Sequence, residues 1–301
     1  MRAGIPIAAA VASLLWAAEP QPVELLRVPT YTEGIVFDHE GNAYISHSRY
    51  ITRVRPDGSS SVWAETGAPN GHKVLADGTH LVCDASHHAV LHLSAEGKIL
   101  GKAAAEFEGQ PLARPNDLTL DPKGGFYFTD PVSGTGTGQV YYVDPQRKVH
   151  RIASDLRFPN GIVLRPDGKT LLVAESQRNR ILAFDVIEPG KVQNMRVFAD
   201  LPAKQGDQID NQPDGMCLDE EGNLYVAHYG MRQVQVLDPA GKLIGRYPGG
   251  NLTTSNVAFG GPEMNQLYIT GAIGTEKGSE GVLFRLDLPG VRGLRILPAR
   301  K

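Results

Sequence analysis

The sequence predicts an all-β fold, a six-bladed β-propeller in which four-stranded antiparallel blades surround a central channel. A repeated two-strand unit is the main reason. A second is the content of turn-forming residues, 34 Gly and 21 Pro among 301 residues, as many short strands require. A third is the lack of any long amphipathic helical pattern. Because a radial array of repeats closes as one unit, a single propeller over residues 22–301 is expected despite the length.

The repeated unit is clearest at residues 158–175, FPNGIVLRPDGKTLLVAE. A Pro-Asn-Gly turn precedes an apolar strand at 162–164, and an Arg-Pro-Asp-Gly turn precedes a second strand at 171–174. Turn residues around short apolar runs predict a β-hairpin. Asn160 stands eight positions before the turn glycine Gly168 (168 − 160).

The same spacing recurs along the chain. Glu33, Asn116 and Asp214 each stand eight positions before a glycine (41 − 33, 124 − 116 and 222 − 214). A fifth copy begins at Asn70 in a looser register, and a sixth begins near Ser255. The copies are separated by roughly 37 to 54 residues, the range of sheet-blade repeats.

The N-terminal residues contain two segments with different predicted roles, a signal peptide and a strand that closes the ring. Residues 1–18 combine one arginine with an apolar run of about 14 residues, too short to cross a bilayer and typical of a signal peptide. We therefore expect a periplasmic or secreted protein, or a cytoplasmic one if this segment is not a signal. The strand within 22–30 is expected to pair with the C-terminal strands and close the ring.

Composition narrows the possible partners. A formal net charge of −3 and a pI near 6.3 leave no basic footprint, which argues against nucleic-acid binding. Cys83 and Cys217 fall in different blades, so we expect free thiols without a metal motif. By analogy with other propellers, we expect a monomer with no membrane contact in the mature form.

One face of the propeller should gather polar residues, because the start of the first strand and the end of the second share an edge in an antiparallel hairpin. The strand starts supply Glu33, Asn70, Asn116, Asn160, Asp214 and Ser255. The strand ends supply His47, Asp84, Asp130, Glu175 and His228. The innermost strands line the channel, so the first group should converge on its mouth. Long polar loops at 133–138 and 203–212 are expected to add binding groups.

The repeated oxygen donors indicate a metal site. Asn and Asp before a strand are ordinary turn residues, but Glu33 has no special turn role and shares their register. Calcium takes six to eight oxygen ligands, so Glu33, Asn116, Asn160 and Asp214 would leave positions open for a substrate. Another divalent metal is the alternative.

Zinc is one such rival. It would use His47, His72 and His228, although their different registers do not suggest a tetrahedral set.

Four segments resemble a known family: EGIVFD, RPNDLTLDPKGGFYFTD, FPNGIVLRPDGKTLLVAES and QPDGMCLDEEGNLYVAHYG. They are similar to the blade motifs of the gluconolactonase, regucalcin (senescence marker protein) and luciferin-regenerating-enzyme family. That family includes the drug-responsive lactonase and, more distantly, diisopropyl fluorophosphatase. The resemblance covers nearly the whole chain after about residue 25. It implies a six-bladed propeller with calcium at the channel mouth that hydrolyses lactones or, in one branch, organophosphates.

The resemblance also implies roles for individual residues. Glu33, Asn160 and Asp214 match metal ligands, and Asn116 matches a position that binds metal in some members and substrate in others. Arg114 matches an arginine that contacts a sugar lactone.

The substrate side is less well defined. Blade two departs from the family pattern, so a substrate contact at Asn70 or His72 rests on a looser match. His228 and Tyr229 are further candidates for contact with the substrate, with packing as the alternative.

Two carboxylates are candidates for the catalytic base that activates water. The family pattern favours Asp214, but a carboxylate bound to a dication is a weak base. Asp117, directly after Asn116, would be unligated and more basic, or would only orient Asn116. Both are retained as catalytic candidates.

The leading functional hypothesis is a calcium-dependent lactonase acting on a small lactone, most simply a sugar lactone. Hydrolysis of organophosphates at the same site is the alternative within enzymes, and the polar loops with Arg114 favour a hydroxylated substrate. A protein-binding propeller of the NHL type is the non-enzymatic alternative, and a metal-free lyase resembling strictosidine synthase is a further one. Converging oxygen ligands argue against both.

Overall fold

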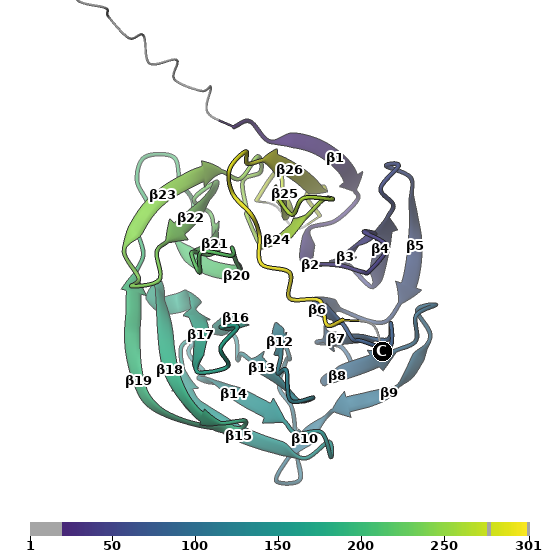
Figure 1. Ribbon diagram of the computed structural model, residues 1–301, viewed down its shortest axis with the longest axis vertical. Coiled ribbons are helices and arrows are strands. Elements are labelled where there is room, and N and C mark those ends of the chain that lie inside the picture. Colours follow the sequence, from purple (N-terminus) through teal and green to yellow (C-terminus); the bar gives the residue numbers. More distant parts are fainter. Residues whose placement is uncertain (1–19, 276–277, 300–301) are drawn as a thin grey trace, which may run out of the picture.

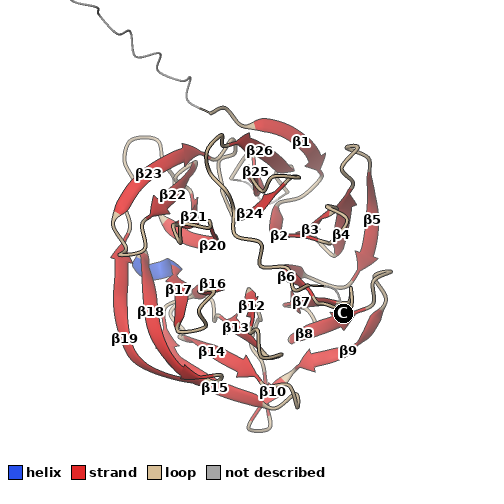
Figure 2. Ribbon diagram, viewed as in Figure 1, coloured by secondary structure: helices blue, strands red, loops and turns tan. Residues whose placement is uncertain are grey.

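The computed structural model describes residues 20–275 and 278–299 and forms a six-bladed β-propeller (Figure 1). Six four-stranded antiparallel sheets are arranged radially around a central channel. Apart from one 3₁₀ helix, η1 (Ser176–Arg178), the described residues form strands, turns and loops (Figure 2). The predicted fold class is therefore confirmed.

Each blade is a meander numbered from the channel outward. Blade 1 contains β2 (Thr32–Phe37), β3 (Ala43–His47), β4 (Tyr50–Val54) and β5 (Ser60–Glu65). Blade 2 contains β6 (Pro69–Val74), β7 (His80–Asp84), β8 (Ala89–Leu93) and β9 (Ile99–Ala104). Blade 3 contains β12 (Leu118–Leu120), β13 (Phe126–Asp130), β14 (Gly138–Val143) and β15 (Val149–Leu156). A small hairpin, β10 (Glu106–Phe107) with β11 (Gln110–Pro111), joins blades 2 and 3.

The second half of the ring follows the same order. Blade 4 contains β16 (Pro159–Leu164), β17 (Thr170–Glu175), β18 (Arg180–Glu188) and β19 (Lys191–Asp200). Blade 5 contains β20 (Gln212–Leu218), β21 (Leu224–Tyr229), β22 (Gln233–Leu237) and β23 (Leu243–Pro248). Blade 6 contains β24 (Asn256–Gly260), β25 (Gln266–Ala272), β26 (Gly281–Asp287) and, as its outermost strand, β1 (Val23–Val28).

Strand β1 closes the ring. It pairs antiparallel with β26, so the first strand of the chain completes the last blade. This confirms the pairing expected for residues 22–30. Because β1 and β26 share one sheet, strands from the beginning and the end of the described propeller are joined in blade 6.

The hydrophobic core is divided into clusters between neighbouring blades. One cluster contains Val163 and Leu172 of blade 4 with Met216 and Leu224 of blade 5. Adjacent blades therefore bury apolar faces against each other, as the alternating strand pattern requires.

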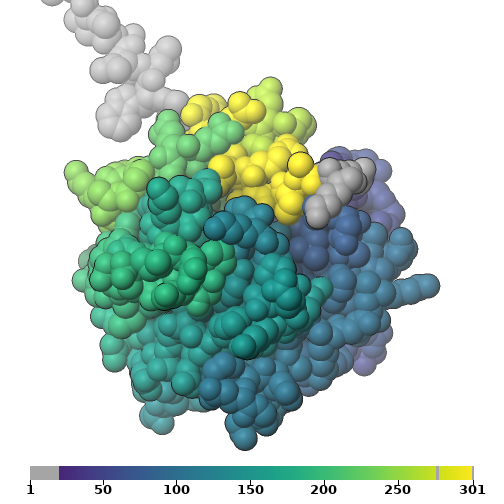
Figure 3. All heavy atoms as spheres, turned by 60° about the horizontal axis from the view of Figure 1, so that its bottom comes forward, coloured from purple at the N-terminus to yellow at the C-terminus, as the bar shows by residue number. Residues whose placement is uncertain are grey.

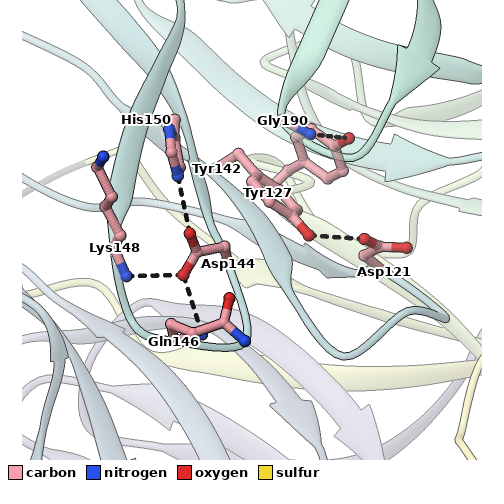
Figure 4. A network of polar contacts seen from close by, with 8 residues as sticks. All are labelled: Asp121, Tyr127, Tyr142, Asp144, Gln146, Lys148, His150 and Gly190. Carbon is pink, nitrogen blue, oxygen red and sulfur yellow. Dashed lines mark hydrogen bonds and ion pairs between the residues drawn. The ribbon is translucent and has the colours of Figure 1, made fainter.

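Carboxylates hold the turns at one end of the blades. Figure 4 shows blade 3, where the Tyr142 hydroxyl donates to Asp121 over 2.8 Å. In the next turn, Asp144 accepts the backbone N–H groups of Gln146 and Lys148, each at 2.9 Å. These bonds hold the face of the propeller opposite the strand starts.

The C-terminal segment crosses that opposite face, where it lies over the channel (yellow in Figures 1 and 3). The Leu294 N–H donates to the Leu218 carbonyl over 2.9 Å, and His39 Nε2 lies 2.7 Å from the Pro298 carbonyl oxygen. The segment therefore contacts blades 5 and 1 and covers one end of the channel.

The Pro-Asn-Gly segment is not a turn, contrary to the sequence prediction. Strand β16 begins at Pro159, and the pairing of β16 with β17 shifts register between Pro159 and Ile162. Similar shifts occur near the starts of β2, β6 and β20. Gly161 lies within the shifted stretch. A Cβ atom at this position would overlap the Asp214 carbonyl oxygen of the neighbouring blade, so glycine is required there. This glycine permits close contact between blades.

Other expectations meet the structure only in part. Cys83 is buried and Cys217 half-buried, and both are free thiols. Within the described residues, no helix has the length and apolar character needed to cross a membrane. The predicted signal peptide at residues 1–18 lies outside them.

Candidate active site

A cavity of about 790 Å³ opens at the channel mouth where the innermost strands start. Polar residues that line it include Glu33, Asn70, Arg114, Asn116, Asn160, Asp210, Gln212, Asp214 and Tyr229. The structure thus brings together the four residues predicted as metal ligands, each from a different blade. Arg114 joins them in the same wall.

Hydroxyl groups from neighbouring blades hold the backbone at these positions. In each case a Ser or Thr near the end of one blade's second strand donates to a carbonyl of the next blade's innermost strand. The bonds are Thr270 to Glu33 at 2.6 Å, Ser46 to Asn70 at 2.7 Å, Thr129 to Asn160 at 2.8 Å and Ser176 to Pro213 at 2.6 Å. The repeat therefore positions the site residues through the joints between blades.

The two carboxylates at the mouth repel each other. Burial raises the pKa of Glu33 to about 8, the Arg114 guanidinium opposes that shift, and Asp117 adds to it. Burial, followed by the charges of Glu33 and Asp117, raises the pKa of Asp214 well above its usual range, although a hydrogen bond from Asn160 opposes this. A cation would relieve this repulsion.

The donor set fits a hard divalent cation. Asn116 and Asn160 are each 6% exposed and Asp214 is 8% exposed, so these oxygen donors are largely withdrawn from water. No group of three or more His, Cys, Asp or Glu side chains is placed to hold a metal in residues 20–275 and 278–299. Two carboxylates with two amides are instead the oxygen set that calcium accepts.

The zinc alternative is wrong for the described geometry, because the three histidines point to different partners. His47 Nε2 lies 2.8 Å from Thr52 Oγ1, within blade 1. His72 and His228 contact residues outside the cavity, as described next, so the imidazoles do not converge.

His72 does not line the cavity, which corrects the expectation of a substrate contact. Its Nε2 lies 2.7 Å from His80 Nδ1, and its ring packs against Trp63 and Tyr44 of blade 1. The side chain is 1% exposed. The register shift between Pro69 and His72 accompanies this orientation, in which the ring fills the joint between blades 1 and 2.

His228 is also fully buried outside the cavity, so its predicted substrate contact is corrected as well. Its Nε2 lies 2.8 Å from Asn179 Oδ1, and its Nδ1 lies 3.2 Å from Gln235 Nε2. Burial lowers the pKa of His228 to about 4. Because side chains alternate along β21, the neighbouring Tyr229 lines the cavity instead.

Asp117 is buried and does not line the cavity. Its Oδ1 accepts the N–H of Leu118 over 2.8 Å. Burial raises its pKa, and the Lys73 ammonium opposes this shift. The charge of Asp117 also raises the pKa values of Glu33 and Asp214, although Asp117 does not reach the cavity wall.

The acids at the strand ends hold the segments that lead into the innermost strands. Asp130 accepts the N–H groups of Ala113 at 2.9 Å and of Arg114 at 2.5 Å. Glu175 similarly accepts the N–H of Arg157 at 2.8 Å. Asp130 therefore fixes the backbone that carries Arg114.

Sequence reasoning missed several residues of the wall. Tyr31 was missed because it lies outside the repeated register, and its ring centroid is 6.4 Å from that of Tyr229. Tyr229, a predicted candidate for substrate contact, does line the cavity. Asp210 and Gln212 come from the long loop at 203–212, whose length and polarity were the available signal. The loop at 133–138 reaches the site through Ser133, which accepts a bond from Arg114 over 3.0 Å.

The fold and this site define a propeller with a concave, small-molecule site at one end of its channel. Residues 31–273 match the model of the SMP-30/gluconolactonase/LRE-like region, and the chain belongs to that family.

Three known proteins show the similarity. Lactonase drp35 of Staphylococcus saprophyticus is 31% identical over 246 residues, covering 76% of this chain and 72% of that one. Diisopropyl-fluorophosphatase of Loligo vulgaris is 25% identical over 240 residues, covering 69% and 75%. The structure of a gluconolactonase from Xanthomonas campestris superposes with a TM-score of 0.78 at 27% identity, covering 90% and 91%. Together these relatives support a hydrolase.

Proposed function

We propose that this protein is a lactonase that requires a divalent cation, with calcium preferred, and that opens a small sugar lactone in the cavity at the channel mouth. The observation that carries this proposal is the convergence of two carboxylates and two amides from four blades on one wall. Similarity to a lactonase and to a gluconolactonase supports the reaction class.

Glu33, Asn116, Asn160 and Asp214 would hold the cation. When bound, the cation would supply positive charge that polarises the lactone carbonyl. Arg114 lies in the same wall and would orient the substrate through its guanidinium donors. The buried amides and the walls of the cavity would limit the water around the reacting ring.

Hydrolysis needs a base for the attacking water. The water oxygen bonds to the carbonyl carbon, the ring C–O bond breaks, and the freed alkoxide receives a proton, so the product is a hydroxy acid. Asp214 lines the cavity whereas Asp117 does not, which supports Asp214 as the group that takes the proton from water. Asp117 would then act on Asp214 through its charge.

Organophosphate hydrolysis is the second candidate, because the chain is similar to diisopropyl-fluorophosphatase. The polar wall favours the lactone, since Arg114, Asn70 and Gln212 offer partners to ring hydroxyls. A platform for protein binding has no need of buried carboxylates that repel each other.

The test is hydrolysis of a panel of aldonolactones, simple γ- and δ-lactones and a phosphofluoridate, followed as acid release above the spontaneous rate. Activity should vanish with chelator and return with calcium. Asp214→Asn should abolish turnover, whereas Asp117→Asn should retain a measurable rate. Folded protein that hydrolyses none of the panel with any divalent metal would refute the proposal.

We also propose that residues 1–18 direct export and that the mature protein is a monomer with no membrane or nucleic-acid partner. N-terminal sequencing of the native protein and its mass in solution test these points. An intact Met1 in the cytoplasm would refute export, and a stable dimer would refute the second point.

A further inference from the structure

We infer that Asp210 determines specificity for hydroxylated lactones by accepting hydrogen bonds from the ring hydroxyls of the substrate. This inference rests on the proposed lactonase function. Asp210 is a carboxylate in the cavity wall and stands outside the predicted metal set, four positions before Asp214.

The loop that carries Asp210 is anchored to the turn after β21. The Ile209 N–H donates to the Gly230 carbonyl over 3.0 Å, and Gln208 Nε2 donates to the Met231 carbonyl over 3.2 Å. Gly230 has a φ of +80°, and a Cβ atom there would lie 2.5 Å from Asp210 Cβ and 2.6 Å from its Cα. The glycine therefore allows the loop to pack closely and places the carboxylate before a substrate arrives.

The Asp210 carboxylate has hydrogen-bond acceptor positions left for a ligand. Its Oδ1 accepts the N–H of Asn211 and its Oδ2 accepts Gln212 Nε2, each over 2.8 Å. An ionised carboxylate has about four lone-pair sites, so these two bonds leave acceptor positions at the half-buried side chain.

Asp210 lies near the predicted metal set without belonging to it. The pKa of Tyr229 is raised by burial and then by the charges of Asp210, Asp214 and Glu33. The Tyr229 hydroxyl is therefore within electrostatic reach of both Asp210 and the predicted metal ligands. A ring whose carbonyl faces Asp214 would present its hydroxyl-bearing carbons toward the surrounding wall, where Asp210 offers an acceptor.

A hydrogen bond to a charged acceptor is worth roughly 10- to 100-fold in affinity. An unsubstituted lactone has no hydroxyl to donate and would gain nothing from it. Asp210 should therefore raise kcat/KM for aldonolactones relative to unsubstituted lactones of the same ring size.

The experiment compares kcat/KM for an aldono-δ-lactone and for unsubstituted δ-lactone with the calcium-loaded full chain. The variants are Asp210→Asn and Asp210→Ala. The matched control is Asp207→Asn, because Asp207 lies on the same loop but has an 84% exposed side chain. Both Asp210 variants should lose about 10- to 100-fold with the hydroxylated substrate and less than about 2-fold with the plain one. The control should match the unmodified protein with both.

An equal loss with both substrates would overturn the inference and point to a role of Asp210 in the chemical step. No loss with either would overturn it as well. A separate binding titration uses the corresponding aldonolactam, which keeps the ring hydroxyls and resists hydrolysis. If the unmodified protein hydrolyses no lactone yet binds the lactam in a manner that depends on Asp210, the lactonase proposal fails and the binding role stands. If it neither hydrolyses nor binds, both fail.

Discussion

Replacing Gly161 with alanine tests whether the glycines that follow the site residues let neighbouring blades approach each other. A Cβ atom at this position would overlap the Asp214 carbonyl oxygen, and it would lie 3.0 Å from the Asp214 carbonyl carbon and 3.1 Å from Gly215 Cα. All three are backbone atoms, so no side-chain rotation relieves the overlap. Strands β16 and β20 must move apart.

The structure sets the expected size of this effect. Overpacking of a tightly packed interior costs about 1–3 kcal/mol, and a backbone overlap belongs at the upper end of that range. Alanine in place of glycine in a strand recovers about 0.5–1 kcal/mol of chain entropy. We therefore expect Gly161→Ala to lower the free energy of unfolding by about 2 kcal/mol.

Urea unfolding measures this change, with Gly101→Ala in β9 as the matched control. A Cβ atom at residue 101 meets no heavy atom within 4 Å, so the control should be neutral or slightly stabilised. Calcium binding by Gly161→Ala should also weaken, because the displaced carbonyl belongs to Asp214. Equal stability of the two variants would show that the close approach is not what requires glycine at this position.

Other features of the structure yield separate predictions. Burial lowers the pKa of His80 to about 4, below the value of about 6.5 that it has in an unfolded chain. The unfolded chain therefore binds more protons between these values, and stability should fall as the pH drops from 6.5 toward 4. The slope should reach about 1.4 kcal/mol per pH unit for this group, and His80→Gln should show a shallower dependence in urea titrations from pH 7.5 to 4.5. Because the pKa of Glu33 is raised to about 8 and that of Asp214 well above its usual range, calcium binding at pH 7 should release at least about one proton, which calorimetry in buffers of different ionisation enthalpy detects; no buffer dependence would contradict it. Asp130→Ala should leave the Ala113 and Arg114 N–H groups without their partner and raise KM for an aldonolactone about 10-fold or more, while calcium affinity stays unchanged; an unchanged KM would refute this positioning role.

The sequence repeat predicts the arrangement of the blades and the position of the strand starts. An eight-residue spacing between a polar residue and a turn glycine places the start of each innermost strand at the same height. Residues as distant as Glu33 and Asp214 were therefore expected at one mouth of the channel, and they line one cavity there. Ring closure by β1 followed from a strand that preceded the first complete unit.

The orientation of side chains near the strand starts could not be predicted as well from the sequence. Register shifts occur at the beginning of β2, β6, β16 and β20, so the alternation of the apolar residues further along each strand does not extend to the site residues. The sequence did not reveal these shifts. The predicted substrate contact of His72 is therefore wrong, and its ring packs between blades 1 and 2. The same uncertainty led Gly161 to be interpreted as a turn residue.

By itself, the sequence determined the all-β class, the number of blades and the residue types that gather at the channel mouth, because these depend on periodicity and turn chemistry along the chain. Only the tertiary structure decided which of those residues face the cavity. Asp117 and His228 are turned away from it, and Asp210 enters it from a loop that packs over Gly230. Contacts between blades and loops set these orientations, and such contacts join residues whose separation in the chain carries no periodic signal.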